Sequence, residues 1–184
     1  MTHDLTTLPP DLPAPEDDGA ADELPGAAVP DLALPSTGGG AVSLARVPGP
    51  ALVFAFPWAG RPGEPLPAEG WDAIPGARGC TAEACGFRDV HAELRALGLE
   101  VVGVSAQSPA RQAELVARLG LPYPLLSDER LELAGALGLP TFEAGGRALL
   151  RRLTMLLRDG AVERVWYPVF PPDRHAERVL GDLG

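Results

Sequence analysis

The sequence predicts an α/β fold in which short buried strands alternate with helices. Three observations support this prediction. Residues 51–56 read A-L-V-F-A-F, a nearly continuous apolar run that is typical of a strand buried on both faces. Residues 80–97 carry apolar side chains at the spacing of one helix face. Asp159-Gly160 stands between two apolar runs and is a strong hairpin signal.

The remaining elements are assigned in chain order. Before the first buried strand, S-T-G-G-G separates residues 31–34 from residues 41–44, which predicts a small hairpin. After the helix at 80–97, which Gly98 ends, we expect a strand at 99–105, a helix at 109–119, a short segment at 124–128, a short helix up to residue 137, strands at 149–157 and 162–167, and a last helix at 173–183. This order predicts a thioredoxin-like fold with a central mixed sheet flanked by helices.

Two segments lie outside this pattern. Residues 1–28 are rich in Pro, Ala, Asp and Glu without apolar periodicity, so we expect a leader, disordered or draped over the surface, before a single domain at 29–184. Residues 58–75 form a Pro- and Gly-rich insertion before the helix at 80–97, and a loop of this length is usually functional or mobile. Trp71 in this insertion is expected either to cover a pocket or to pack on the core.

The composition limits the possible partners. A formal charge of −10 at pH 7 argues against nucleic acid and against anionic membrane surfaces. No stretch is long and apolar enough to cross a bilayer, and M-T-H-D-L-T-T lacks the features of a signal peptide, so we expect a cytoplasmic protein with reduced thiols. In that compartment a cysteine pair is more often catalytic, sensing or metal-binding than structural. Zinc is disfavoured because there are two cysteines at an unusual spacing and scattered histidines, His3, His91 and His175.

The two cysteines, Cys80 and Cys85, open the predicted helix at 80–97. In an α-helix, residues five apart have Cα atoms about 8.6 Å apart and about 140° around the axis. A disulfide needs a Cα separation of roughly 4.4–6.8 Å. The two sulfurs can therefore bond only if the first turns of the helix unwind, which couples oxidation to local unfolding.

Cys80 is the expected nucleophile of the pair. Free N–H groups and the positive end of the helix dipole favour an anion at a helix start, whereas Cys85 lies more than a turn inside. The sequence thus predicts a stabilised thiolate at Cys80. Gly79 and Gly76 allow the backbone to approach a small ligand closely. The alternative interpretation is that both cysteines are small buried hydrophobic residues.

The run G-C-T-A-E-A-C-G-F-R-D resembles the active-site helix of peroxiredoxins of the Q type, also called bacterioferritin comigratory proteins. The likeness extends to the hairpin at 31–44, G-V-S at 103–105, P-L-L-S-D at 124–128 and R-L-T-M-L-L-R-D-G at 152–160. The resemblance implies a thiol peroxidase that reduces hydrogen peroxide and small organic hydroperoxides without metal or organic cofactor. Cys80 would become a sulfenic acid, Cys85 would condense with it to a disulfide, and a thioredoxin-like protein would reduce that disulfide.

The resemblance also implies the other site residues. Arg152, by its place in R-L-T, matches a family arginine that hydrogen-bonds near the thiolate and the peroxide. Without the resemblance, Arg152 reads as a solvated strand arginine like its neighbour Arg151. Glu83 matches a position that is often Glu or Gln in the family, and alone it reads as a first-turn acid that complements the helix dipole. The residues assigned to peroxide binding are Pro57, Gly79, Thr81 and Glu83.

The sequence departs from the family pattern P-x-x-x-T/S-x-x-C. Three residues before Cys80 stands Ala77, so the hydroxyl that contacts peroxide in the family is absent. Thr81 or a group in the insertion is the expected substitute. The matching proline is predicted to be Pro57, separated from the cysteine by the insertion, with Pro75 as the alternative.

The remaining expectations concern the charge near Cys80, the function class and the oligomeric state. Arg78, two residues before Cys80, is expected either to supply charge to the site or to face solvent. The rival function is a redox-sensing interaction module that uses the same cysteine switch without efficient turnover. The absent hydroxyl and the long insertion favour the sensor, whereas Arg152 and the intact cysteine run favour the enzyme. The negative charge and the insertion together predict a monomer.

Overall fold

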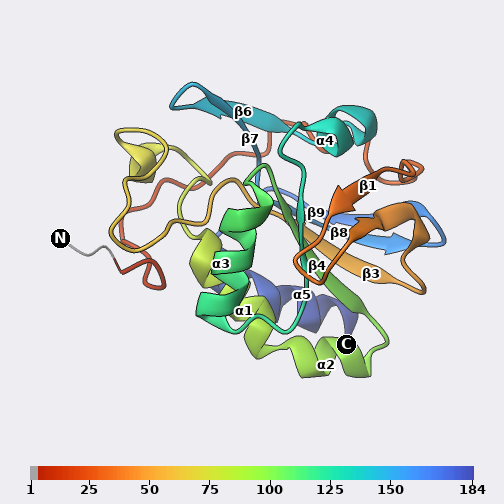
Figure 1. The fold of residues 1–184 in the computed structure, drawn as a ribbon. Helices are drawn as coiled ribbons and strands as arrows, with labels where there is room; N and C mark the ends of the chain where they lie inside the picture. Colours follow the sequence, from red (N-terminus) through yellow and green to blue (C-terminus); the bar gives the residue numbers. More distant parts are fainter. Residues whose placement is uncertain (1–3) are drawn as a thin grey trace.

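The computed structural model describes residues 4–184 and has a mixed five-stranded sheet at its centre (Figure 1). The strand order is β5 (Leu125–Ser127), β4 (Glu100–Ser105), β3 (Ala51–Ala55), β8 (Leu153–Arg158) and β9 (Ala161–Trp166). Strands β3, β4 and β5 are parallel, whereas β8 pairs antiparallel with both β3 and β9. This mixed sheet with helices around it confirms the predicted fold class.

Helices and two small hairpins surround the sheet. The helices are α1 (Cys80–Asp89), α2 (His91–Ala96), α3 (Pro109–Leu119), α4 (Glu132–Leu137) and α5 (His175–Leu183). The hairpins are β1 (Ala33–Pro35) with β2 (Ala41–Ser43), and β6 (Thr141–Ala144) with β7 (Arg147–Leu150). The first hairpin confirms the one predicted from S-T-G-G-G. The turn between β8 and β9 is also as predicted, with Asp159 at φ +51° and Gly160 at φ +75°.

Alternate side chains of β3 point into two separate cores. Leu52 and Phe54 pack with side chains of α1, α2, α3 and α5, and the Phe54 ring stacks on Phe87 with centroids 4.6 Å apart. Val53 packs with side chains of α4, the β1–β2 hairpin and the leader. In Figure 1, α1, α2 and α5 lie below the sheet and α4 lies above it. Both faces of β3 are covered, which explains the continuous apolar run in the sequence.

The single helix predicted at 80–97 is wrong, because α1 and α2 are separated at Val90. The backbone of Val90 has φ −101° and ψ 10°, outside the helical region. The Leu94 N–H still donates to the Val90 carbonyl oxygen at 3.1 Å, so the two helices meet at a bend. The bend directs Leu94 into the core but leaves Leu97 44% exposed, although both fit one helical stripe in the sequence.

The single strand predicted at 149–157 is also wrong. Strand β7 ends at Leu150 and β8 begins at Leu153, and the two arginines between them leave the ladder. Strand β7 pairs instead with β6, which the sequence pattern did not predict. Arg151 and Arg152 are therefore placed by the connection between two strands and not by the alternation of side chains along one strand.

The leader lies along the surface of the domain from residue 4 onward. Leu24 is buried among core side chains, and Ala28 forms a bridge with Ala161 of β9. Closer to the amino terminus, the Arg78 guanidinium donates to the Asp4 carbonyl oxygen at 2.9 Å. The leader therefore extends from β9 to the segment that precedes α1.

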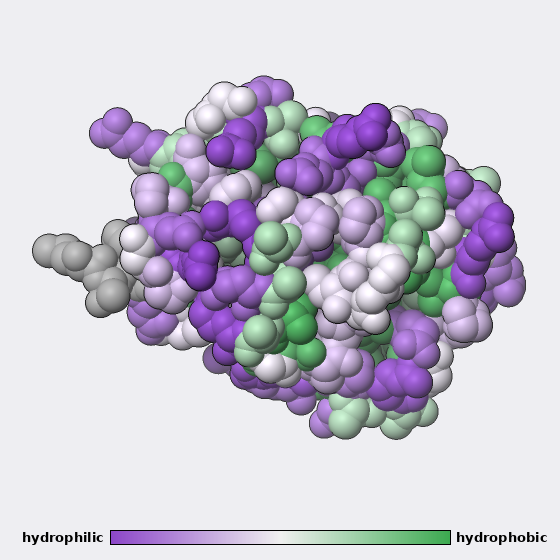
Figure 2. Space-filling model, in the orientation of Figure 1, coloured by the Kyte–Doolittle hydropathy of each residue, from purple (hydrophilic) through white to green (hydrophobic). Residues whose placement is uncertain are grey.

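The surface combines hydrophilic side chains with small apolar groups. On the face shown in Figure 2, hydrophilic side chains surround several small clusters of apolar ones. Within residues 4–184, no helix has both the length and the apolar character needed to cross a membrane. His3 lies outside the described residues.

His175, the first residue of α5, lies in the core. Its ring packs edge-on against Phe87 of α1, with centroids 5.8 Å apart, and its Nε2 lies 2.7 Å from the Thr154 hydroxyl of β8. Burial lowers the pKa of His175 from its ordinary 6.5 to about 3, and the Arg152 charge acts in the same direction. His175 is therefore neutral in the folded protein, as expected of a core histidine.

We expect His175 to make the protein less stable as the pH falls from 6.5 toward about 3. In that range the unfolded chain binds a proton on this histidine and the folded chain does not. The contribution is therefore complete above pH 6.5 and is lost on acidification by up to about 1.4 kcal/mol per pH unit. Denaturant titrations at several pH values should show a shallower acid decline for His175→Gln than for the parent, and equal slopes would contradict this.

Candidate active site

Cys80 is the first residue of α1, as the sequence predicts. Gly79 before it has φ +107°, in the left-handed region that favours glycine. A Cβ at Gly79 would lie 2.4 Å from the Pro172 Cγ, so no larger residue fits there without a shift of the backbone or of Pro172. The close contact holds the start of α1 against the turn that precedes α5. Cys80 is 2% exposed.

Three groups contact the Cys80 sulfur. The Arg152 Nη2 donates to it at 3.2 Å, and the backbone N–H of Trp58 donates at 3.4 Å. The thiol faces the Ala77 carbonyl oxygen at 3.7 Å. Two donors from segments far apart in the sequence therefore converge on one sulfur, and both favour its anionic form.

Arg152 lies in the connection between β7 and β8 and is almost fully buried, in contrast to Arg151. Its Nη1 forms an ion pair with the carboxylate of Glu83, one turn after Cys80. Its Nη2 also faces the carbonyl oxygens of residues 76, 77 and 78 at 3.3, 3.3 and 3.1 Å. One guanidinium thus joins the sheet, the turn at 76–78 and the first turns of α1.

Burial and neighbouring charges act in opposite directions on the Cys80 thiol. Burial raises its pKa, and the Glu83 carboxylate adds to that effect, whereas the Arg152 charge and the Trp58 N–H lower it. Burial is the larger effect, so the pKa of Cys80 is raised in this geometry. This differs from the stabilised thiolate predicted at the helix start. The reason is the loss of hydration around the sulfur, which the sequence pattern does not reveal.

Glu83 is completely buried beside the site. Burial raises its pKa from the ordinary 4.5 to about 7, and the Arg152 charge opposes this rise. Its Oε2 contacts Arg152, while its Oε1 has no hydrogen-bond partner among residues 4–184. Near neutral pH Glu83 therefore exchanges between a neutral acid and a carboxylate, and only the carboxylate competes with Cys80 for the Arg152 charge. Glu83 therefore does more than complement the helix dipole, which is the role that its position alone indicates.

Burial and position distinguish the two candidates for the proline of the family pattern, Pro57 and Pro75. Pro57 is buried and immediately precedes Trp58, whose N–H reaches the sulfur, whereas Pro75 is exposed. This favours Pro57 as the proline beside Cys80. Thr81 is buried in α1, and within the described chain its hydroxyl makes no hydrogen bond to the sulfur. Peroxide binding by Pro57, Gly79, Thr81 and Glu83 stays a prediction.

Arg78 and Trp71 have structural contacts away from the sulfur. Arg78 is buried rather than exposed, but its guanidinium pairs with Asp72 at 3.4 Å and with the Asp4 carbonyl oxygen. Arg78 thus neither faces solvent nor contacts Cys80. Trp71 packs in a small separate core beside Phe142, with ring centroids 6.2 Å apart. Of the two expectations for Trp71, packing on a core is therefore the correct one.

Cys85 is half-buried within an intact α1, and both cysteines are free thiols. The Glu83 N–H donates to the Gly79 carbonyl oxygen at 2.9 Å, and the Tyr123 hydroxyl donates to the Ala84 carbonyl oxygen at 2.6 Å. These bonds hold the turn between the two sulfurs in helical form. A disulfide between residues five apart in a helix needs that turn to open.

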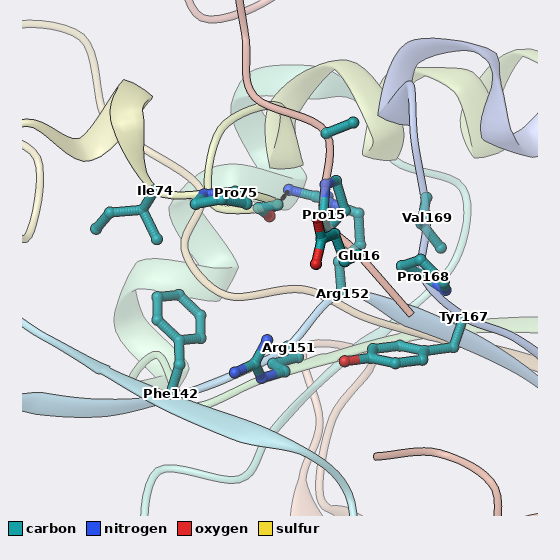
Figure 3. Close-up of a pocket in the computed structure, with 12 residues that line it drawn as sticks. Pro15, Glu16, Ile74, Pro75, Phe142, Arg151, Arg152, Tyr167, Pro168 and Val169 are labelled. Atoms are coloured by element: carbon teal, nitrogen blue, oxygen red, sulfur yellow. Dashed lines mark hydrogen bonds between the residues drawn. The ribbon is translucent and has the colours of Figure 1, made fainter. Parts of the chain in front are cut away.

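A cavity of about 400 Å³ lies beside Arg152 (Figure 3). In Figure 3, Pro15 and Glu16 of the leader lie between Pro75 and Pro168, next to Arg152. The apolar part of the lining comes from the leader, the turn before α1, β6 and the segment after β9: Ala14, Pro15, Ile74, Pro75, Phe142, Tyr167, Pro168 and Val169. Cys80 does not line the cavity, so the cavity meets the site at the arginine and not at the sulfur.

Trp58 is the site residue that sequence reasoning missed. It contributes a backbone N–H, which any residue other than proline carries, so its side chain gave no signal. The one available signal was its position directly after Pro57, the proline matched to the family pattern.

Fold and site together define a class of protein. A cysteine at the start of the helix after the first buried strand, with an arginine brought to it from the connection before the neighbouring strand β8, is an arrangement for thiol redox chemistry. Residues 24–180 match the family model described as Redoxin. The chain belongs to the redoxin family, and its relatives include peroxiredoxins of the Q type.

Several similar curated proteins are plant peroxiredoxins Q described as chloroplastic. The protein of Sedum lineare is 30% identical over 156 residues, which cover 84% of this chain and 75% of that protein. The protein of Arabidopsis thaliana is 33% identical over 156 residues, 84% of this chain and 64% of the relative. The chain thus spans just under two thirds of the length of several curated relatives.

Solved structures show the same similarity. Peroxidoxin BcpB from Mycobacterium tuberculosis has a TM-score of 0.67 at 29% identity, covering 86% of this chain and 95% of that one. Peroxiredoxin Q from Xanthomonas campestris has a TM-score of 0.64 at 26% identity, covering 94% and 95%. The thioredoxin-like fold and the family resemblance predicted from the sequence are therefore confirmed.

Replacing Glu83 with Gln should make Cys80 more acidic. The substitution removes the charge that competes for Arg152, so the pKa of Cys80 should fall, and the difference should grow above pH 7, where the parent Glu83 is ionised. We expect at least about threefold more thiolate near pH 8. Thiolate absorbance measured against pH in a Cys85→Ser background tests this.

The matched control for that experiment is Glu93→Gln, the same change at an exposed position in α2. It should leave the Cys80 titration unchanged. An unchanged or raised pKa of Cys80 in Glu83→Gln would show that the carboxylate does not compete for the arginine.

Proposed function

We propose that this chain is a thiol peroxidase that reduces hydrogen peroxide through Cys80. The observation that carries the proposal is the Arg152 guanidinium 3.2 Å from the Cys80 sulfur at the start of α1. The Cys80 thiolate attacks one peroxide oxygen, the O–O bond breaks, and the departing hydroxide takes a proton to become water. The sulfur is oxidised to a sulfenic acid and the peroxide is reduced.

Arg152 has two roles in this step. Its charge stabilises the thiolate against burial, and its N–H groups lie close enough to the sulfur to stabilise negative charge that develops on the departing oxygen. Because the guanidinium is fixed by Glu83 and by three carbonyl oxygens, it needs little reorganisation when the charge moves.

The second half of the proposed cycle uses Cys85. Its thiol condenses with the Cys80 sulfenic acid, forming the S–S bond and releasing water. A thioredoxin-like dithiol then reduces that disulfide by exchange and is itself oxidised. Both cysteines belong to α1 of one chain, which supports a monomer as the working unit.

Small organic hydroperoxides are proposed as further substrates. The cavity beside Arg152 has a mostly apolar lining and a volume of about 400 Å³, which suits a short carbon skeleton. Alkyl peroxide reduction activity is ascribed to the bacterioferritin comigratory protein of Xanthomonas campestris, whose structure matches this chain with a TM-score of 0.63 at 26% identity.

Replacing Cys80 with Ser should abolish peroxide consumption driven by a thioredoxin system, because the attacking sulfur is lost. Cys85→Ser should still react once with peroxide but should lose recycling, so overoxidised Cys80 accumulates. Turnover is followed by reductant consumption, and overoxidation is followed by mass spectrometry. Stoichiometric oxidation of the parent without turnover would favour the redox-sensing module instead, and normal recycling of Cys85→Ser would refute the resolving role.

Oxidation of the parent should speed amide exchange around residues 79–87. The two sulfurs cannot bond across an intact turn, so the helix bond from the Glu83 N–H to the Gly79 carbonyl oxygen has to open. Exchange measured by mass spectrometry on the reduced and peroxide-treated protein tests this, with α3 as the internal control. Unchanged protection at 79–87 in a disulfide-bonded sample would contradict coupled unwinding.

A further inference from the structure

The site lacks the hydroxyl that the family pattern places three residues before the cysteine. Ala77 stands at that position, and its only polar contribution is a carbonyl oxygen 3.7 Å from the sulfur. A carbonyl cannot donate to a thiolate. The Trp58 N–H at 3.4 Å is the second donor to the sulfur after Arg152. The orientation of this one peptide group therefore matters for the site.

The backbone on either side of Trp58 is fixed at two points. Before it, the Phe56 N–H donates to the Val104 carbonyl oxygen at 3.1 Å, which is the last bond to the sheet on that side. Pro57 has no N–H and adds none. After it, Ala59 is held by the side chain of Gln107: the Ala59 N–H donates to Oε1 at 2.9 Å, and Nε2 donates to the Ala59 carbonyl oxygen at 3.0 Å.

Gln107 is itself held in one position. It is 3% exposed, its backbone N–H donates to the Ser105 hydroxyl at 3.3 Å, and its carbonyl oxygen accepts from the Ser127 hydroxyl at 2.7 Å. Gln107 thus connects two parts of the fold. Its backbone bonds to the ends of β4 and β5, and its side-chain amide bonds to the loop that carries the Trp58 N–H. A two-point contact of this kind fixes both the position and the rotation of the Ala59 backbone.

We propose that Gln107 is a positioning residue that holds the Trp58 N–H on the Cys80 sulfur, and that this N–H gives the site a hydrogen-bond donor that Ala77 does not provide. The proposal rests on Cys80 being the reactive thiol of the proposed function. Gln107 does not touch the sulfur and acts through the peptide between Pro57 and Ala59.

Contacts of the Trp58 side chain also help to hold this residue in place. Its ring has the Arg111 guanidinium 4.8 Å and the Arg147 guanidinium 5.5 Å from its centroid. Arg111 is in turn paired with Glu64 at 2.8 Å. The ring is thus held by cations from α3 and β7 while the backbone is held by Gln107.

The test compares Gln107→Leu with Gln112→Leu in the Cys85→Ser background. Both glutamines are buried and bond to the polar groups at the ends of β4 and β5, but Gln112 bonds to Ser105 and Leu126 and makes no hydrogen bond to Trp58 or Ala59. The charged groups facing the sulfur, Arg152 and Glu83, are unchanged in both variants. Titration of the Cys80 thiolate by ultraviolet absorbance is the readout, with thermal unfolding measured in parallel.

Gln107→Leu should lower the fraction of Cys80 thiolate at neutral pH by about tenfold, because a hydrogen bond to the anion is lost. Gln112→Leu should cost similar stability but leave the titration within about twofold of the parent. If Gln107→Leu does not fold, Gln107→Asn, whose amide is one methylene too short to reach Ala59, should change the titration in the same direction.

An unchanged or more acidic Cys80 in a folded Gln107 variant would overturn the proposal, and so would an equal change in Gln112→Leu. The outcome is separate from that of the proposed function, because the thiol titration needs no peroxide. If the parent protein does not turn over peroxide, the proposed peroxidase function is refuted. The effect of the Gln107 substitutions on the Cys80 titration can still be interpreted.

Discussion

The buried guanidinium of Arg152 is the interaction on which the rest of the site depends. A charge placed inside the domain is costly unless ionic and hydrogen-bonding partners surround it, and here the partners are the Glu83 carboxylate, the Cys80 sulfur and three carbonyl oxygens. These partners belong to the start of α1 and to the turn before it. The group that hydrogen-bonds to the sulfur therefore also holds together the segments that present it.

Burial has two opposing consequences for this site. It raises the pKa of Cys80 and so works against the reactive anion, but it also removes water that would weaken the field of the guanidinium. The balance between them depends on a few donors, since the helix start alone does not outweigh the loss of hydration. Each N–H aimed at the sulfur then matters more than it would at an exposed thiol.

Much of the fold follows from local signals in the sequence. The apolar run of β3, the proline and glycine that bound α3, and the Asp159-Gly160 turn each specify their element within a few residues. The failures have non-local causes. Hydrophobic periodicity does not encode the bend at Val90, and it does not encode the break at Arg151 and Arg152, where Arg152 pairs with Glu83 of α1.

The features of the site can likewise be divided into those that the sequence predicts and those that only the folded chain shows. The placement of Cys80 at a helix start could be read from the glycines and the helical pattern, and the partnership with Arg152 came from family resemblance, because 72 positions of chain separate the two residues. The Trp58 N–H and the raised pKa of Glu83 depend on distances and burial that exist only in the folded chain.

The course of the leader also affects how the protein is handled. Its first described residue bonds to Arg78, and Leu8 packs against Gly79, directly beside the cysteine-bearing helix. Residues 4–8 therefore lie against the segment that leads into the cysteine-bearing helix, and a deletion that removed them would expose the buried Arg78 and Gly79. A shortened variant intended for kinetics should consequently retain the leader.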